Sequence, residues 1–166
     1  REFCHRAGRT PRLNEQAGIA AQQSLRIAEA ARSHEIVVAD TTALMIAVYS
    51  EQVFGDTSLY DSALADHARS SLTLLTALDL PWQADGLQRD GPHVREPVDA
   101  LVRAALARAA IDCAVVFGQG PQRLANALAA VQRALHPPQD DGTKRWQWVC
   151  DRCGDAGCER HWLASL

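Results

Sequence analysis

The sequence lacks several features that would place the protein at a membrane or on nucleic acid. No apolar run approaches the ~20 residues that a helix needs to cross a bilayer. The formal net charge is only −3, which argues against a general affinity for nucleic acid or acidic membranes but allows a local cationic site. The first residues, REFCHRAGRTPRLNE, are too polar for a secretory signal or an anchor. We therefore expect a cytoplasmic protein whose five cysteines are reduced.

Helical and strand-like patterns alternate along the chain, whose 166 residues suit one main domain. Apolar residues recur at helical spacing over about 14–33, 42–53, 58–69, 97–109 and 121–135, and short apolar runs at 36–39, 72–76 and 113–117 are typical of buried strands. This alternation predicts an α/β fold with a parallel, doubly wound sheet. We expect the main domain to cover 1–136, a polar linker 137–143 and a cysteine-rich tail 144–166.

The segment 79–95, DLPWQADGLQRDGPHVR, is the most informative part of the sequence. It follows the predicted strand 72–76 and ends where a helix is expected to begin. Pro81 fixes the exit angle from the strand, and Gly86 and Gly91 supply the freedom that a closing loop needs. An arginine-bearing loop after a strand is how α/β proteins place mobile cations over an anionic ligand. The segment therefore suggests phosphate chemistry.

The order VVADTT … LTLLTALDLPWQADGLQRDG … AVVFGQG resembles the AAA-type P-loop domain at the C-terminus of bacterial NAD-biosynthesis regulators. In those proteins the domain serves as a ribosylnicotinamide kinase, and related free-standing ATPases share the pattern. The resemblance covers roughly residues 1–135, and the Pro-Trp-x-x-Asp-Gly-Leu run is its most specific part. It implies a P-loop NTPase-like fold that binds ATP with Mg²⁺ and a small-molecule phosphoryl acceptor.

The resemblance also implies roles for five residues. Asp40 would lie near Mg²⁺ and the acceptor hydroxyl, Arg89 and Arg95 would contact phosphates, and Asp85 and Trp82 would belong to the substrate-binding loop. Each residue has a simpler interpretation. Asp40 could be the N-cap of the next helix and Asp85 could cap a turn. The arginines could be solvated loop charges, and Trp82 could be a packing residue.

The sequence departs from the family pattern in two ways. Gln88 stands where the family usually has arginine, and the 166 residues contain no G-x-x-x-x-G-K-[ST]. That loop binds the β- and γ-phosphates in such enzymes. We therefore expect the chain to be a fragment that lacks catalysis by itself, taken from a protein that transfers phosphate from ATP to a nucleoside-like hydroxyl or to water. The alternative is a non-enzymatic module that responds to nucleotide or is stabilised by zinc.

The tail carries a separate motif. Cys150, Cys153, Cys158 and His161 place three thiols and an imidazole within a short stretch at C-x-x-C and C-x-x-H spacing. Zn²⁺ prefers four nitrogen or sulfur ligands in a tetrahedron, and a C-x-x-C turn is a usual way to present two of them. The motif predicts a compact zinc site, and a reduced tail without metal is the alternative.

Overall fold

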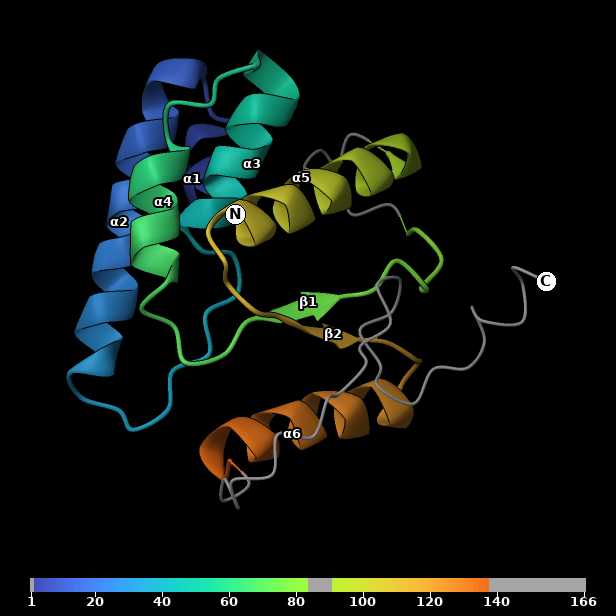
Figure 1. Ribbon diagram of the computed structural model, residues 1–166. Helices are drawn as coiled ribbons and strands as arrows, with labels where there is room; N and C mark the ends of the chain where they lie inside the picture. Colours follow the sequence, from blue (N-terminus) through green and yellow to red (C-terminus); the bar gives the residue numbers. More distant parts are fainter. Residues whose placement is uncertain (1, 84–90, 138–166) are drawn as a thin grey trace. The chain divides into compact units, whose positions relative to one another are not determined.

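The computed structural model describes residues 2–83 and 91–137. Its elements, in chain order, are α1 (Glu2–Ala7), α2 (Leu13–Ala31), α3 (Ala43–Phe54), α4 (Tyr60–His67), β1 (Leu74–Thr76), the 3₁₀ helix η2 (Pro92–Val94), α5 (Arg95–Arg108), β2 (Ala114–Val116) and α6 (Pro121–Leu135) (Figure 1). The chain forms two compact units. Unit 1 comprises Arg1–Ser70 and Trp82–Ile111, and unit 2 comprises Ser71–Pro81 and the described residues from Asp112 onward.

Unit 1 is a helical layer built around α3. This helix has the sequence ALMIAVYSEQVF and contacts α2, α4 and α5. Because it is apolar on most of its surface, it is buried on several sides, and Ala47, Val48 and Ser50 have no exposed surface. The buried Ser50 hydroxyl donates to the Asp56 carboxylate at 3.1 Å, so burial leaves it hydrogen-bonded. The helix ends at Gly55, whose φ of 69° confirms the break predicted there.

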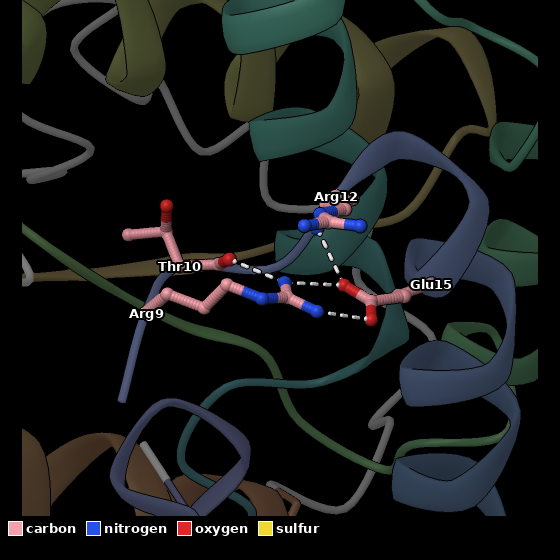
Figure 2. Close-up of polar contacts among 4 residues, drawn as sticks. All are labelled: Arg9, Thr10, Arg12 and Glu15. Carbon is pink, nitrogen blue, oxygen red and sulfur yellow. Dashed lines mark hydrogen bonds and ion pairs between the residues drawn. The ribbon is translucent and has the colours of Figure 1, made fainter. Parts of the chain in front are cut away.

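The start of α2 is fixed by a group of charged side chains (Figure 2). The Glu15 carboxylate accepts the backbone N–H of Arg12 at 2.7 Å, which satisfies a donor that the helix leaves unpaired. The Arg9 guanidinium donates to both oxygens of the same carboxylate, at 2.7 and 2.8 Å. The bond from Arg9, and then the one from Arg12, lower the pKa of Glu15 to about 2.

Unit 2 contains the parallel sheet of the described residues. Strands β1 and β2 pair in register, with Leu74 opposite Ala114 and Thr76 opposite Val116 (Figure 1). Helix α6 follows β2 and contacts it, burying Ala130 while Val116 is only 4% exposed. The strands predicted at 72–76 and 113–117 are therefore confirmed with shorter bounds, and the helix predicted at 121–135 is confirmed as α6.

The strand predicted at 36–39 is wrong. Residues 36–39 form neither a helix nor a strand, and Ile36 and Val38 are 60% and 88% exposed. The physical reason is the lack of a neighbour, because the described strands pair only with each other and a β-branched run becomes a strand through cross-strand hydrogen bonds and packing. The described residues thus form a mixed α/β structure with a small parallel sheet, and a doubly wound sheet is not confirmed. Among these residues, no helix combines the length and the apolar character that a bilayer crossing requires.

Candidate functional site

Asp40 lies in the turn that leads into α3, and its side chain is exposed. The N-cap of this helix is Thr42, so the interpretation of Asp40 as the helix cap is wrong. Between the two, Thr41 has a φ of 66°, a left-handed conformation that is unfavourable for a β-branched residue. Such strain is retained where the surrounding structure imposes it, and it occurs often at functional sites.

The Thr42 side chain contacts a residue of α4, which also belongs to unit 1. Its hydroxyl Oγ1 shares a hydrogen bond with Nδ1 of His67, at the end of α4, over 3.2 Å. Burial of the imidazole lowers the pKa of His67 below its ordinary value of 6.5, so the neutral ring is favoured at neutral pH. A neutral ring with Nδ1 unprotonated accepts a hydrogen bond from the Thr42 hydroxyl. This bond joins the turn after Asp40 to α4.

Arg95 is the first residue of α5 and is half-buried. The loop therefore ends where the sequence predicts a helix to begin. Just before it, Gly91 has a φ of 108°, and a Cβ there would lie 3.1 Å from Nδ1 of His93. Trp82, in the same unit, is also half-buried, which is compatible with the packing interpretation. Asp85 and Arg89 lie outside the described residues.

Three of the predicted site residues, Asp40, Trp82 and Arg95, lie within residues 2–83 and 91–137. Each of them lies at the end of an element or in a connecting segment of unit 1. The four predicted zinc ligands, Cys150, Cys153, Cys158 and His161, lie outside the described residues. Their role stays a prediction.

Unit 2 contains a polar cluster that the sequence analysis missed. Asp79 follows β1, and its carboxylate accepts the backbone N–H of Gly118, which follows β2, at 2.5 Å. The same carboxylate forms an ion pair with Arg123 of α6. Arg123 Nε in turn donates to the carbonyl of Gly118 at 2.8 Å. The cluster of Asp79, Gly118 and Arg123 thus connects the carboxyl ends of both strands to the first turn of α6.

A signal for this cluster is present in the sequence. Asp79 and Gly118 each lie shortly after a predicted strand, and carboxyl ends of neighbouring parallel strands meet at one edge of a sheet. The sequence shows that both residues lie near that edge. It does not show that they touch, because Asp79 and Arg123 are 44 positions apart.

Parallel strands that carry polar residues at their carboxyl ends, followed by a glycine turn into a helix, are the features of α/β domains that bind nucleotides. The family described as an AAA domain matches residues 1–123, and the chain belongs to this family. It is therefore a P-loop NTPase-like, nucleotide-binding domain. No curated protein and no solved structure matches this chain.

Proposed function

We propose that this domain takes part in phosphoryl transfer from Mg²⁺-bound ATP, either to a nucleoside-like hydroxyl, as in the ribosylnicotinamide kinases that the sequence resembles, or to water. The observation that carries the proposal is the position of Asp40 in a domain of the AAA family. The carboxylate is exposed, does not cap α3, and precedes a residue in a left-handed conformation.

These features of Asp40 support a role with a metal ion. A carboxylate is a ligand that Mg²⁺ prefers, and P-loop enzymes hold the ion through an acidic residue together with the phosphates of ATP. Residues 36–39 before Asp40 are not a strand, so the support comes from its exposed carboxylate and from the turn that carries it. A fixed turn keeps such a ligand in one place, which is the condition for electrostatic stabilisation of the transition state. We assign Asp40 to Mg²⁺ or to the acceptor hydroxyl.

The position of Arg95 supports a role with phosphate. The N-terminus of a helix carries a partial positive charge, so a cation in the first turn of α5 is placed against the helix dipole. The same combination of an arginine and a helix N-terminus is favourable towards a phosphate group. We assign Arg95, together with Arg89, to the phosphates, and Trp82 and Asp85 to the substrate-binding loop.

The test compares two proteins in a steady-state assay with Mg²⁺-ATP. One is the 166-residue chain, which contains no G-x-x-x-x-G-K-[ST], and the other is the product of the whole reading frame that encodes it. We expect no measurable turnover by the first, because positioning and electrostatics supply nearly all catalysis in phosphoryl transfer. Turnover by the 166-residue chain would contradict the account. Absence of both ATP binding and turnover in the whole product would favour an interaction module that is not an enzyme.

We propose separately that the tail binds one Zn²⁺ through Cys150, Cys153, Cys158 and His161. The support is the number and the spacing of the four side chains. Metal binding would supply much of the folding free energy of so short a segment. A zinc-stabilised tail is compatible with either function of the main domain.

Metal analysis of protein purified under reducing conditions, from cells grown with zinc, tests this proposal. We expect one zinc per chain, and a loss of zinc in Cys153→Ser with the unfolding of the main domain unchanged. Cys113→Ser is the matched control, because this cysteine lies outside the motif in the sequence, and its loss should leave the zinc content unchanged. A zinc content near zero in the wild type, with all tail thiols reactive, would contradict the proposal.

A further inference from the structure

The turn 118–120 is held at both backbone groups of its first residue. The N–H of Gly118 donates to the Asp79 carboxylate at 2.5 Å, and its carbonyl accepts from Arg123 Nε at 2.8 Å. The ion pair between Asp79 and Arg123 completes a closed ring of three contacts. Both the donor and the acceptor of Gly118 are thus bonded to charged side chains, and such bonds are the stronger ones.

The conformation of this turn depends on glycine. Gly118 has a φ of 91° and Gly120 a φ of 51°, both in the range that favours glycine. A Cβ on Gly118 would also lie 3.1 Å from three atoms of the Gln122 side chain. Because two glycines leave the turn intrinsically free to change conformation, the contacts from Asp79 and Arg123 help to restrict it, together with the backbone bonds from Gln122 to Gln119 and from Leu124 to Gly120.

The ring is partly shielded from water. The Arg123 side chain is 17% exposed and that of Asp79 is 36% exposed. Next to them, Asn126 Nδ2 donates to the carbonyl of Phe117 at 3.1 Å, so the residue before the turn is held from α6 as well. Exposed ion pairs contribute little, whereas partly buried and geometrically fixed ones contribute more.

We infer that Asp79 and Arg123 are positioning residues, which hold the turn 118–120 at the carboxyl ends of β1 and β2 in the conformation that receives the nucleotide. The inference rests on the proposed nucleotide binding and names residues that the proposal does not use. Ligands of open α/β sheets bind at the carboxyl ends of the strands, and these two side chains hold the backbone there. A small displacement of such backbone weakens binding and catalysis even when no contacting residue is changed.

The experiment uses the product of the whole reading frame and the variant Arg123→Gln. Its matched control is Arg103→Gln, which removes the same charge from an ion pair with Asp99 on α5, where the Nε to Oδ2 distance is 2.7 Å. The first measurement is hydrogen exchange of the Gly118 amide without ligand. The second is the dissociation constant of Mg²⁺-ATP.

In Arg123→Gln we expect Gly118 exchange to be faster and nucleotide affinity to be lower, each by roughly tenfold, because the ion pair with Asp79 and the bond to the Gly118 carbonyl are both lost. Arg123→Lys keeps the charge but cannot reach both partners, so its effects should lie between those of the wild type and Arg123→Gln. Thermal unfolding of each variant shows whether it is folded. Arg103→Gln should change neither measurement.

Two results would overturn the inference. One is a Gly118 amide whose exchange is unchanged in Arg123→Gln. The other is faster exchange with unchanged nucleotide affinity, which would make the ring a purely structural contact. A wild-type protein that does not bind ATP would instead overturn the proposed function, and the exchange data would still report whether the ring restrains the turn.

Discussion

Residues 36–39 and strand β1 are two short apolar runs that are each followed by an aspartate, yet their surroundings differ. Strand β1 pairs with β2, and Asp79 after it accepts a backbone N–H and forms an ion pair. Residues 36–39 have no paired strand among the described residues, and Asp40 after them is exposed. Similar local patterns thus give a carboxylate that is bonded within the structure in one place and an exposed carboxylate in the other.

The difference shows that the surroundings of an apolar run decide its structure and the role of its aspartate. A strand is stabilised by its neighbours, so a run without one stays solvated. A carboxylate whose oxygens are already bonded to N–H groups has less capacity for a metal ion than an exposed one. This comparison leads us to place Mg²⁺ or acceptor chemistry at Asp40 and a positioning role at Asp79.

The largest effect should come from placing a charge in the strand that pairs with β1, compared with the same change in residues 36–39. Val116→Asp in β2 puts a carboxyl at a site that is 4% exposed, and we expect it to lower the free energy of unfolding by about 4 kcal/mol. Val38→Asp, at a site that is 88% exposed, should change it by less than about 0.5 kcal/mol. Urea unfolding of the 166-residue chain measures both. Equal losses would mean that residues 36–39 are packed as β2 is.

The next effect concerns turnover by the product of the whole reading frame. Arg95→Ala should raise the activation free energy by roughly 2–4 kcal/mol, as expected when one charge-stabilising donor is lost. Asp40→Asn should also reduce kcat while the unfolding midpoint stays the same, because its side chain is exposed. Steady-state kinetics and thermal unfolding check both. Wild-type rates in both variants would show that the site assignment is wrong.

A smaller effect should distinguish the two threonines that accompany these runs. Thr41 has a left-handed φ of 66°, so Thr41→Gly removes strain and should raise the free energy of unfolding by up to about 1 kcal/mol. Thr76→Gly in β1 removes a strand residue and should lower it by about 1 kcal/mol. Denaturant titrations of the two variants give the signs. A loss of stability in Thr41→Gly would argue against strain at that turn.

The smallest effect concerns pH. The pKa of His67 is lowered in the folded protein by burial, so the unfolded chain binds a proton more readily below the ordinary value of 6.5. Stability should therefore fall as the pH is lowered below 6.5, and His67→Asn should reduce this fall. Thermal unfolding between about pH 5 and 7 measures how stability changes with pH. This range covers roughly one unit around the usual histidine pKa. An identical slope in the variant would show that His67 does not contribute.

The sequence allowed most of the helices to be predicted because their periodicity is local. The helix expected over 42–53 is α3, Ala43–Phe54, and the helix expected over 121–135 is α6, Pro121–Leu135. The features that it did not reveal depend on distant residues or on backbone geometry. Pairing decides whether 36–39 becomes a strand, and the left-handed turn at Thr41 has no signal in its side chain.

The candidate site was predicted to a smaller extent for the same reason. The structure places Asp40 in the turn before α3, not at the end of a strand, and Arg95 at the start of α5. The roles of both residues stay predictions. The ring of Asp79, Gly118 and Arg123 needs β1, β2 and α6 to be brought together, and no local pattern encodes that arrangement. The predicted strand ends show where in the sheet a long-range polar contact can form. They do not show which residues form it.

The most direct test of the difference between the two aspartates is the Mg²⁺ dependence of ATP binding. The dissociation constant of ATP is measured with and without Mg²⁺ for the product of the whole reading frame and for its Asp40→Asn and Asp79→Asn variants. We predict that Mg²⁺ strengthens binding in the wild type and in Asp79→Asn, but not in Asp40→Asn. If Asp40→Asn keeps the full Mg²⁺ dependence of the wild type, the assignment of Asp40 to the metal ion is contradicted.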